Sequence, residues 1–221
     1  MAFLLIIMDG IITALKAQQK NHNRINVYID GLYAFSVERI VGAWLSVGKT
    51  LDQGKIELLK NEDILERALQ TALRFISYRP RSQQEVEQKL LSKEYAPPVV
   101  QKVIERLQTN GLVEDGQFAQ TWIENRTEFR PRSRRLLAME LRQKGISDEI
   151  IEQSFDDLDS EEKLALNAAR KYAHRLNGLE REKFRMRMLG FLARRGFSFE
   201  VSRETERTIW LEMNTINIKT T

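Results

Sequence analysis

The sequence predicts a mainly α-helical protein: three tandem three-helix repeats forming an elongated, curved helical array, preceded by a small N-terminal β-hairpin extension. Two observations lead to this prediction. Strand-like alternation gives way to helical spacing of apolar residues at about residue 62. From there on, the chain resembles itself at an offset of 51 residues, which is typical of repeat architectures.

The first 60 residues contain a predicted β-hairpin. Alternating apolar and polar residues occupy 24–29, a second run occupies 32–37, and Asp30-Gly31 lies between them. An Asp-Gly pair suits a type I′ turn because both central positions of that turn need positive φ. Residues 10–17 are a further candidate strand, and a short helix and a turn are expected within 41–50.

Two short motifs carry the 51-residue offset. The aligned segments are 78–82 (YRPRS) with 129–133 (FRPRS), and 144–147 (KGIS) with 195–198 (RGFS). Glu94 occupies the position at which the later copies have Gly145 and Gly196. Because three short helices bury little apolar surface alone, neighbouring units are expected to stack.

The helix ends are predicted from capping residues, and they give nine helices. The N-cap candidates are Ser82, Asp115, Ser133, Ser147, Ser160 and Ser198. Pro97 suits the first turn of a helix, whereas Gly145 and Gly196 suit the left-handed conformation in which a helix stops. The expected parts of the chain are a β-hairpin extension at 1–60, repeat 1 at 61–114, repeat 2 at 115–159, and repeat 3 with the C-terminal tail at 160–221.

Composition indicates a folded protein with a polarised surface. Of the 221 residues, 42% are hydrophobic and 30% are charged, a balance that argues against disorder. The net charge is +4, but residues 115–162 have 7 basic and 12 acidic side chains whereas residues 163–221 have 13 and 6. The apolar run at 2–7 is too short to span a bilayer and lacks the features of a signal peptide, and Met8 is an alternative start to Met1.

Catalytic and metal-binding motifs are not apparent in the sequence. There is no cysteine, and His22 and His174 lie far apart without ligand spacing, so we expect no metal site and surface positions for both histidines. Residues 47–50 (VGKT) resemble the end of a phosphate-binding loop, but Ala43 stands where that loop needs glycine. A turn is the better interpretation, and we expect neither an enzyme nor a cofactor.

Arginines are concentrated around the repeated Arg-Pro motif. Residues 126–135 contain five arginines against one acid, Glu128. A guanidinium donates two hydrogen bonds to a phosphate, so arginines at equivalent places in successive repeats predict a track for a polyanion. The alternative is a structural role, with the arginines paired to acidic neighbours. The candidate contact residues are Arg79, Arg81, Arg126, Arg130, Arg132, Arg134, Arg135, Lys144, Lys183, Arg185, Arg187, Arg194 and Arg195.

Four aromatic residues lie at repeated or helical positions. Tyr78 and Phe129 precede the Arg-Pro pair of their repeats, and Trp122 and Trp210 fall on helical faces. Repeated apolar positions belong to the core more often than to stacking platforms for bases. We therefore expect these rings to be core residues.

The repeated motifs, taken in order, resemble one protein family. They are 78–82, 110–119 (NGLVEDGQFA), 129–133, 144–147 and 194–197. Over about residues 10–213 the chain resembles the RecX family of bacterial recombinase regulators. The resemblance implies a cytoplasmic monomer without a catalytic site or cofactor. It would bind the RecA recombinase filament on single-stranded DNA and mostly inhibit its ATPase, strand-exchange and coprotease activities in DNA repair.

The resemblance also implies direct binding to DNA, single-stranded and, as an open alternative, double-stranded. The third repeat departs from the family pattern, since Glu182 and Phe184 stand at the Pro and Ser positions of the Arg-Pro-Arg-Ser motif. Two other functions remain as alternatives. One is a stand-alone DNA-binding protein or repressor that uses a three-helix unit as a helix-turn-helix. The other, weaker alternative is an ATP-using enzyme built on residues 47–50.

Overall fold

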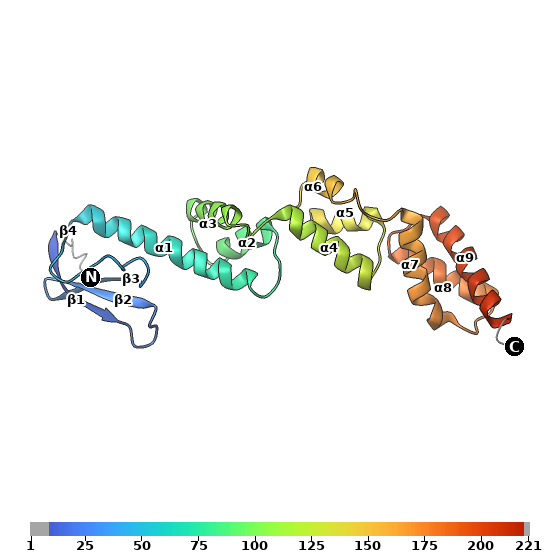
Figure 1. The fold of residues 1–221 in the computed structure, drawn as a ribbon, viewed down its shortest axis with the longest axis horizontal. Helices are drawn as coiled ribbons and strands as arrows, with labels where there is room; N and C mark the ends of the chain where they lie inside the picture. Colours follow the sequence, from blue (N-terminus) through green and yellow to red (C-terminus); the bar gives the residue numbers. More distant parts are fainter. Residues whose placement is uncertain (1–8, 219–221) are drawn as a thin grey trace, which may run out of the picture. The chain divides into compact units, whose positions relative to one another are not determined.

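The structure, a computed structural model, describes residues 9–218, so the apolar run at 2–7 and the choice between Met1 and Met8 lie outside the described residues. An antiparallel sheet is followed by nine α-helices within this range (Figure 1). The strands are β1 (Gly10–Ala17), β2 (Arg24–Ile29), β3 (Leu32–Glu38) and β4 (Thr50–Leu51). The helices are α1 (Gln53–Ile76), α2 (Gln83–Leu91), α3 (Pro97–Thr109), α4 (Asp115–Phe129), α5 (Arg134–Arg142), α6 (Asp148–Gln153), α7 (Glu161–Ala173), α8 (Arg181–Arg194) and α9 (Phe199–Ile218).

These elements form two compact units. The first consists of Met1–Pro80 with Val86–Leu112, and the second of Arg81–Glu85 with Val113–Thr221. The first unit contains the sheet, α1 and α3, together with most of α2. The second contains α4 to α9.

The sheet has the strand order β3-β2-β1-β4, with antiparallel pairs throughout. The predicted hairpin is confirmed, because Ile29 pairs with Leu32 and the turn residues Asp30 and Gly31 have φ of 47° and 83°. β4, which was not predicted, pairs with the start of β1. The short helix expected within 41–50 was wrong: this segment forms turns, and Gly48 has a φ of 90°.

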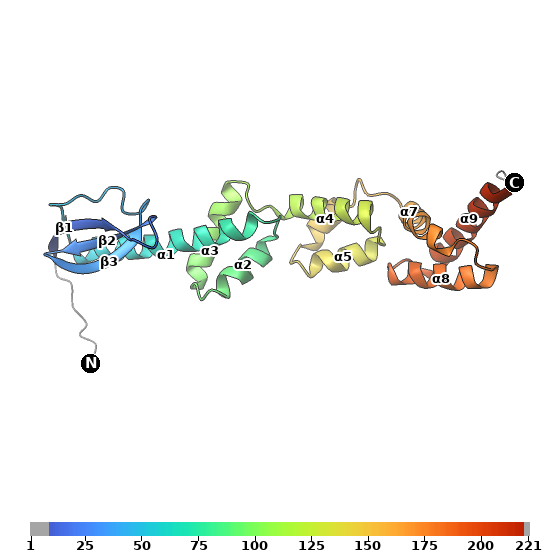
Figure 2. The ribbon, with the colours of Figure 1, turned by 90° about the horizontal axis from the view of Figure 1, so that it is seen from below.

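α1 begins at Gln53, well before the predicted start of helical spacing at about residue 62. Asp52 caps it, accepting a hydrogen bond from the Lys55 amide at 2.8 Å. The first turns carry Ile56 and Leu59, each 1% exposed, into the core beneath the sheet. Helix formation therefore starts early because the helix covers the apolar face of the strands (Figure 2).

A buried ion-pair network joins α1 to the sheet. Arg24 of β2 donates to both carboxylate oxygens of Asp63 on α1, at 3.1 and 3.0 Å, and to Glu38 of β3 at 3.0 Å. Asp63, which is 6% exposed, also accepts the Glu38 amide at 2.6 Å. A bidentate pair with these extra hydrogen bonds fixes the position of the helix on the sheet as well as stabilising it.

The 51-residue repeat is visible in the backbone. The third helices of the repeats, α3, α6 and α9, begin at Pro97, Asp148 and Phe199, which are spaced 51 residues apart. The C-termini of α2, α5 and α8 close in the same way: the amides of Tyr95, Ile146 and Phe197 donate to the carbonyls of Leu90, Leu141 and Leu192. These three leucines are all fully buried. The same helix-terminating motif thus recurs at the predicted period.

The predicted serine caps are confirmed. Ser82, Ser133, Ser147, Ser160 and Ser198 accept hydrogen bonds from the amides of Glu85, Leu136, Ile150, Lys163 and Val201. Asp115 was wrong as an N-cap, because Glu114 occupies that position of α4. The Asp115 carboxylate instead accepts the Gln83 amide at 2.8 Å, at the start of α2, while its partial burial raises its pKa.

The third repeat begins its second helix four residues early. In register with Gln83 and Arg134, α8 would start at residue 185, yet it starts at Arg181. Glu182 replaces the proline that interrupts the earlier copies, so the helix forms through this segment. Phe184 is fully buried in a core built from α7, α8 and α9, which pack together in Figures 1 and 2.

The left-handed position after the second helix differs between repeats. Gly145 and Gly196 have φ of 81° and 89°, whereas Glu94 adopts a φ of 62° with a side chain. A Cβ atom at Gly145 would lie 2.6 Å from Gln84, and one at Gly196 would lie 2.4 Å from the Ser133 hydroxyl. The two glycines are therefore required both by the backbone and by the close approach of a neighbour.

Replacing Glu94 with glycine is expected to stabilise the protein by about 1 kcal/mol, because the left-handed conformation penalises a residue with a Cβ atom. Urea unfolding would measure the change. Glu87→Gly is the matched control, because exposed Glu87 lies within α2, where glycine should cost about 1 kcal/mol. A Glu94→Gly protein less stable than the parent would contradict the prediction.

Candidate functional site

The arginine-rich segment 126–135 spans the end of α4, a short loop and the start of α5. This loop lies within the second unit, where Pro131 and the cap Ser133 are both buried. The Ser133 amide donates to the Arg195 carbonyl at 3.0 Å, which brings the loop next to the end of α8. Arginines from two repeats therefore meet at one place within this unit.

Glu140 on α5 is the centre of this region, and it is only 8% exposed. One of its carboxylate oxygens accepts from Arg126 Nε and from Trp122 Nε1, each at 2.9 Å. Arg132 contacts the other oxygen. The Arg126 guanidinium also lies 4.3 Å from the centre of the Trp122 ring. Arg126 and Arg132 are thus internal partners of a buried carboxylate, which supports the structural alternative for these two residues.

Two further candidates also make internal contacts. Arg134 donates to the carbonyls of Leu158 and Asp159 ahead of α7, at 2.5 and 3.3 Å. Lys144 pairs with Glu85 at 2.8 Å, and its ammonium lies 5.4 Å from the Trp122 ring. Their positions are determined by neighbouring segments of the second unit.

Arg130, Arg135 and Arg194 are exposed, and Arg195 is half-buried. Burial lowers the pKa of Arg132, and so does repulsion from Arg126, Arg195 and Arg130. Burial likewise lowers the pKa of Arg195, with repulsion from Arg130 and Arg194. We call these five residues, Arg126, Arg130, Arg132, Arg194 and Arg195, the arginine cluster. It carries more positive charge than Glu140 neutralises, as is typical of a surface that binds anions.

The remaining candidates lie outside the cluster. Arg79 is exposed and donates to the Pro80 carbonyl at 3.0 Å, while Arg81 is half-buried. On α8, Arg185 and Arg187 are exposed, and Lys183 pairs with Glu180 at 3.3 Å. The arginine run of the third repeat therefore lies along a helix, not in a loop, as a result of the early start of α8.

The aromatic prediction was wrong for two of the four rings. Tyr78 is 78% exposed and Phe129 is 68% exposed, although both occupy one repeat position. Trp122 and Trp210 are partly buried against the cores of their repeats, as expected. An exposed ring next to an Arg-Pro pair therefore recurs in repeats 1 and 2.

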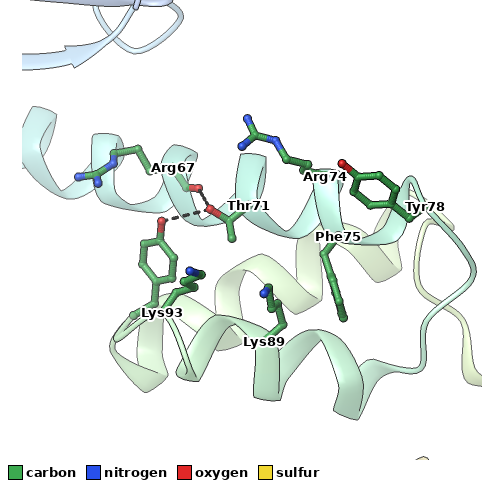
Figure 3. Close-up of a pocket in the computed structure, with 8 residues that line it drawn as sticks. Arg67, Thr71, Arg74, Phe75, Tyr78, Lys89 and Lys93 are labelled. Atoms are coloured by element: carbon green, nitrogen blue, oxygen red, sulfur yellow. Dashed lines mark hydrogen bonds between the residues drawn. The ribbon is translucent and has the colours of Figure 1, made fainter.

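A basic hollow in the first unit was missed by the sequence prediction. It has a volume of about 460 Å³ and lies between α1 and the C-terminal end of α2 (Figure 3). The residues that line it are Arg67, Thr71, Arg74, Phe75, Tyr78, Lys89, Lys93 and Tyr95. The 51-residue alignment contains a signal for it. Lys89 stands where the second repeat has the acidic Glu140, and Thr71 stands where it has the much larger Trp122.

Features that suggested other functions have simple structural explanations. The turn expected at residues 47–50 is present at Val47 and Gly48, just ahead of β4, and Lys49 donates to the Trp44 carbonyl at 3.1 Å. His22 and His174 are exposed, as expected. Among residues 9–218, no group of acidic or histidine side chains could hold a metal ion. No described helix is both long and apolar enough to cross a bilayer.

Family models match most of the chain, in order. The RecX N-terminal domain matches residues 10–52, and the first, second and third RecX three-helix domains match residues 68–107, 115–154 and 159–205. The order of these matches follows the sheet and the three repeats.

Individual relatives agree with these matches. Regulatory protein RecX of Bacillus subtilis (strain 168) is 34% identical over 194 residues, covering 86% of this chain and 74% of the relative. That of Listeria innocua is 32% identical over 196 residues, covering 87% and 73%. A crystal structure of regulatory protein RecX superposes with a TM-score of 0.70 at 25% identity, over 90% of this chain and 99% of the other. The chain belongs to the RecX family of regulatory proteins.

Proposed function

We propose that this protein binds the RecA recombinase filament on single-stranded DNA and modulates it, mostly by inhibiting ATP hydrolysis, strand exchange and coprotease activity. Membership of a family of regulatory proteins that bears the RecX name supports this proposal. The protein would act as a cytoplasmic monomer, without a cofactor and without catalysing a reaction itself.

The observation that carries the proposal is the unneutralised charge of the arginine cluster. A nucleoprotein filament presents phosphates along its length, and arginine is suited to bind them through two parallel hydrogen bonds. Arg130 and Arg194 are exposed and belong to different repeats. They would therefore provide contacts from two successive repeats to one polyanion.

The direct test adds the purified full-length protein to RecA filaments assembled on single-stranded DNA and follows ATP hydrolysis and strand exchange. The expected result is saturable inhibition of both activities at protein concentrations comparable with that of the filament. Unchanged hydrolysis and strand exchange at saturating protein would contradict the proposal.

The three-helix repeats also favour a second candidate function, a stand-alone DNA-binding protein that uses one repeat as a helix-turn-helix. A gel shift with random and selected duplexes, with and without RecA, separates the two functions. The first predicts that stable binding depends on the recombinase. The second predicts sequence-selective duplex binding that does not change when the recombinase is added.

A further inference from the structure

The basic hollow of the first unit is lined by four cationic side chains and no acidic one. Lys89 lies in the last turn of α2 and Lys93 in the turn that follows the helix, and both point toward α1 in Figure 3. Arg67 and Arg74 extend from α1 at the margins of the hollow. Its volume of about 460 Å³ falls within the range of about 300–1,000 Å³ that is usual for ligand sites.

These four cations are not neutralised within the described part of the chain. No ion pair of Arg67, Arg74, Lys89 or Lys93 is found among residues 9–218. Among the described residues, the one cation–π contact of these four side chains is that of the Lys89 ammonium, which lies 5.5 Å from the centre of the Phe75 ring. Cations gathered without a carboxylate repel one another, and a bound anion would relieve that repulsion.

The second repeat provides an internal comparison, because the equivalent place in it is filled. Trp122 aligns with Thr71, and it is packed there with Arg126 against Glu140. Glu140 in turn aligns with Lys89. In the first repeat a small side chain replaces the tryptophan and a cation replaces the carboxylate. The space therefore remains open and its charge is positive.

Two tyrosines line the hollow beside its cations. Tyr78 lines its margin and is 78% exposed. Tyr95 also lines the hollow, and a 3.3 Å hydrogen bond joins its hydroxyl to that of Thr71 on α1. Sites for single-stranded nucleic acid share two features. One is a row of cations along the phosphate backbone, and the other is an aromatic ring on which a base can stack.

We propose that this hollow is a binding site for single-stranded nucleic acid, in which Lys89 and Lys93 hold a backbone phosphate and an adjacent base stacks on Tyr78. The site deepens the proposed function, because it supplies a direct DNA contact in the first repeat. It is tested without recombinase, so that either proposal can fail while the other stands.

The test measures the binding of the full-length protein to a fluorescent oligothymidylate by anisotropy over a series of salt concentrations. Lys89→Ala/Lys93→Ala is expected to bind at least tenfold more weakly and to reduce the salt dependence of log K by about 1.4, or 0.7 for each phosphate that is no longer neutralised. Lys60→Ala/Lys102→Ala, which removes two exposed lysines elsewhere in the same unit, is the matched control. If the two double variants bind within twofold of each other, the site is wrong.

A variant that keeps every cation tests the shape of the site. Thr71→Trp introduces the residue of the second repeat and is expected to weaken binding at least fivefold by filling the hollow. Its thermal midpoint, measured by circular dichroism, shows whether the fold is kept. A folded Thr71→Trp protein with parental affinity would overturn the assignment to the hollow.

The role of the base and the source of the phosphate are tested separately. Tyr78→Ala is expected to weaken oligothymidylate binding at least fivefold and to leave binding of an abasic strand unchanged. Equal affinity of the parent protein for the abasic strand would overturn the stacking role. Displacement of the oligonucleotide by a free nucleotide at equal phosphate concentration would overturn the choice of a strand as the ligand.

Discussion

Replacing Glu140 with alanine is expected to lower the free energy of unfolding by about 3 kcal/mol. The carboxylate is buried, and its removal leaves Arg126 and Arg132 without their shared partner and Trp122 Nε1 without its acceptor. The expected loss is at the lower end of the range for buried pairs because both guanidinium groups keep partial access to water. Urea unfolding monitored by tryptophan fluorescence and circular dichroism would measure the change.

Two further variants show which property of Glu140 matters. Glu140→Gln keeps the shape and an oxygen acceptor but loses the charge, so its stability should lie between those of the parent and Glu140→Ala. Glu124→Ala removes an exposed carboxylate from α4 and should change stability by less than about 0.5 kcal/mol. A loss below about 1 kcal/mol for Glu140→Ala would show that this carboxylate does not hold the arginines together.

Replacing Arg130, Arg135 and Arg194 with alanine together is expected to weaken binding to the RecA–DNA filament about 50-fold at physiological salt. Each phosphate contact contributes a salt slope of about 0.7 on single strands, so three contacts contribute about 2 units of the slope. These three residues are exposed and have no internal carboxylate partner among the described residues. Arg132 and Arg134 are left in place because their internal contacts belong to the fold.

The matched control for this triple variant is Arg175→Ala/Arg203→Ala/Arg207→Ala, which removes the same charge from exposed positions of the second unit. Filament affinity measured by biolayer interferometry at several salt concentrations compares the two proteins. Both should unfold at the parental urea concentration. Equal filament affinities of the two variants would show that the loss comes from a general reduction in charge. A weaker affinity of the Arg130, Arg135 and Arg194 variant, which is the expected result, would show that these arginines contact the filament.

Local features of the sequence were enough to predict much of the fold. Asp30-Gly31 predicted the hairpin because the backbone requirement for its turn falls on two adjacent residues. Ser133 and Ser147 predicted helix starts because a cap acts within three residues. The repeat could be recognised because the same cap and stop residues return after 51 positions.

Features that depend on distant partners were not predictable in this way. β4 consists of two residues, which is too short for any periodicity, and it exists because β1 lies beside it. The five arginines of 126–135 have similar local surroundings in sequence. Arg134 nevertheless contacts a carbonyl 24 residues away while Arg130 faces solvent. The exposure of Tyr78 and Phe129 likewise depends on which neighbours cover them, and sequence spacing does not report that.

The glycine that follows the second helix in repeats 2 and 3 gives the array a direction. Gly145 lies against Gln84 of the preceding repeat, and Gly196 lies against Ser133 of the preceding repeat. Each glycine is thus a docking position for the repeat before it. Glu94 belongs to the first repeat, so no preceding repeat packs against it, and a side chain is tolerated there. This residue therefore distinguishes the first repeat, which docks onto the next one, from the two repeats that also receive a preceding neighbour.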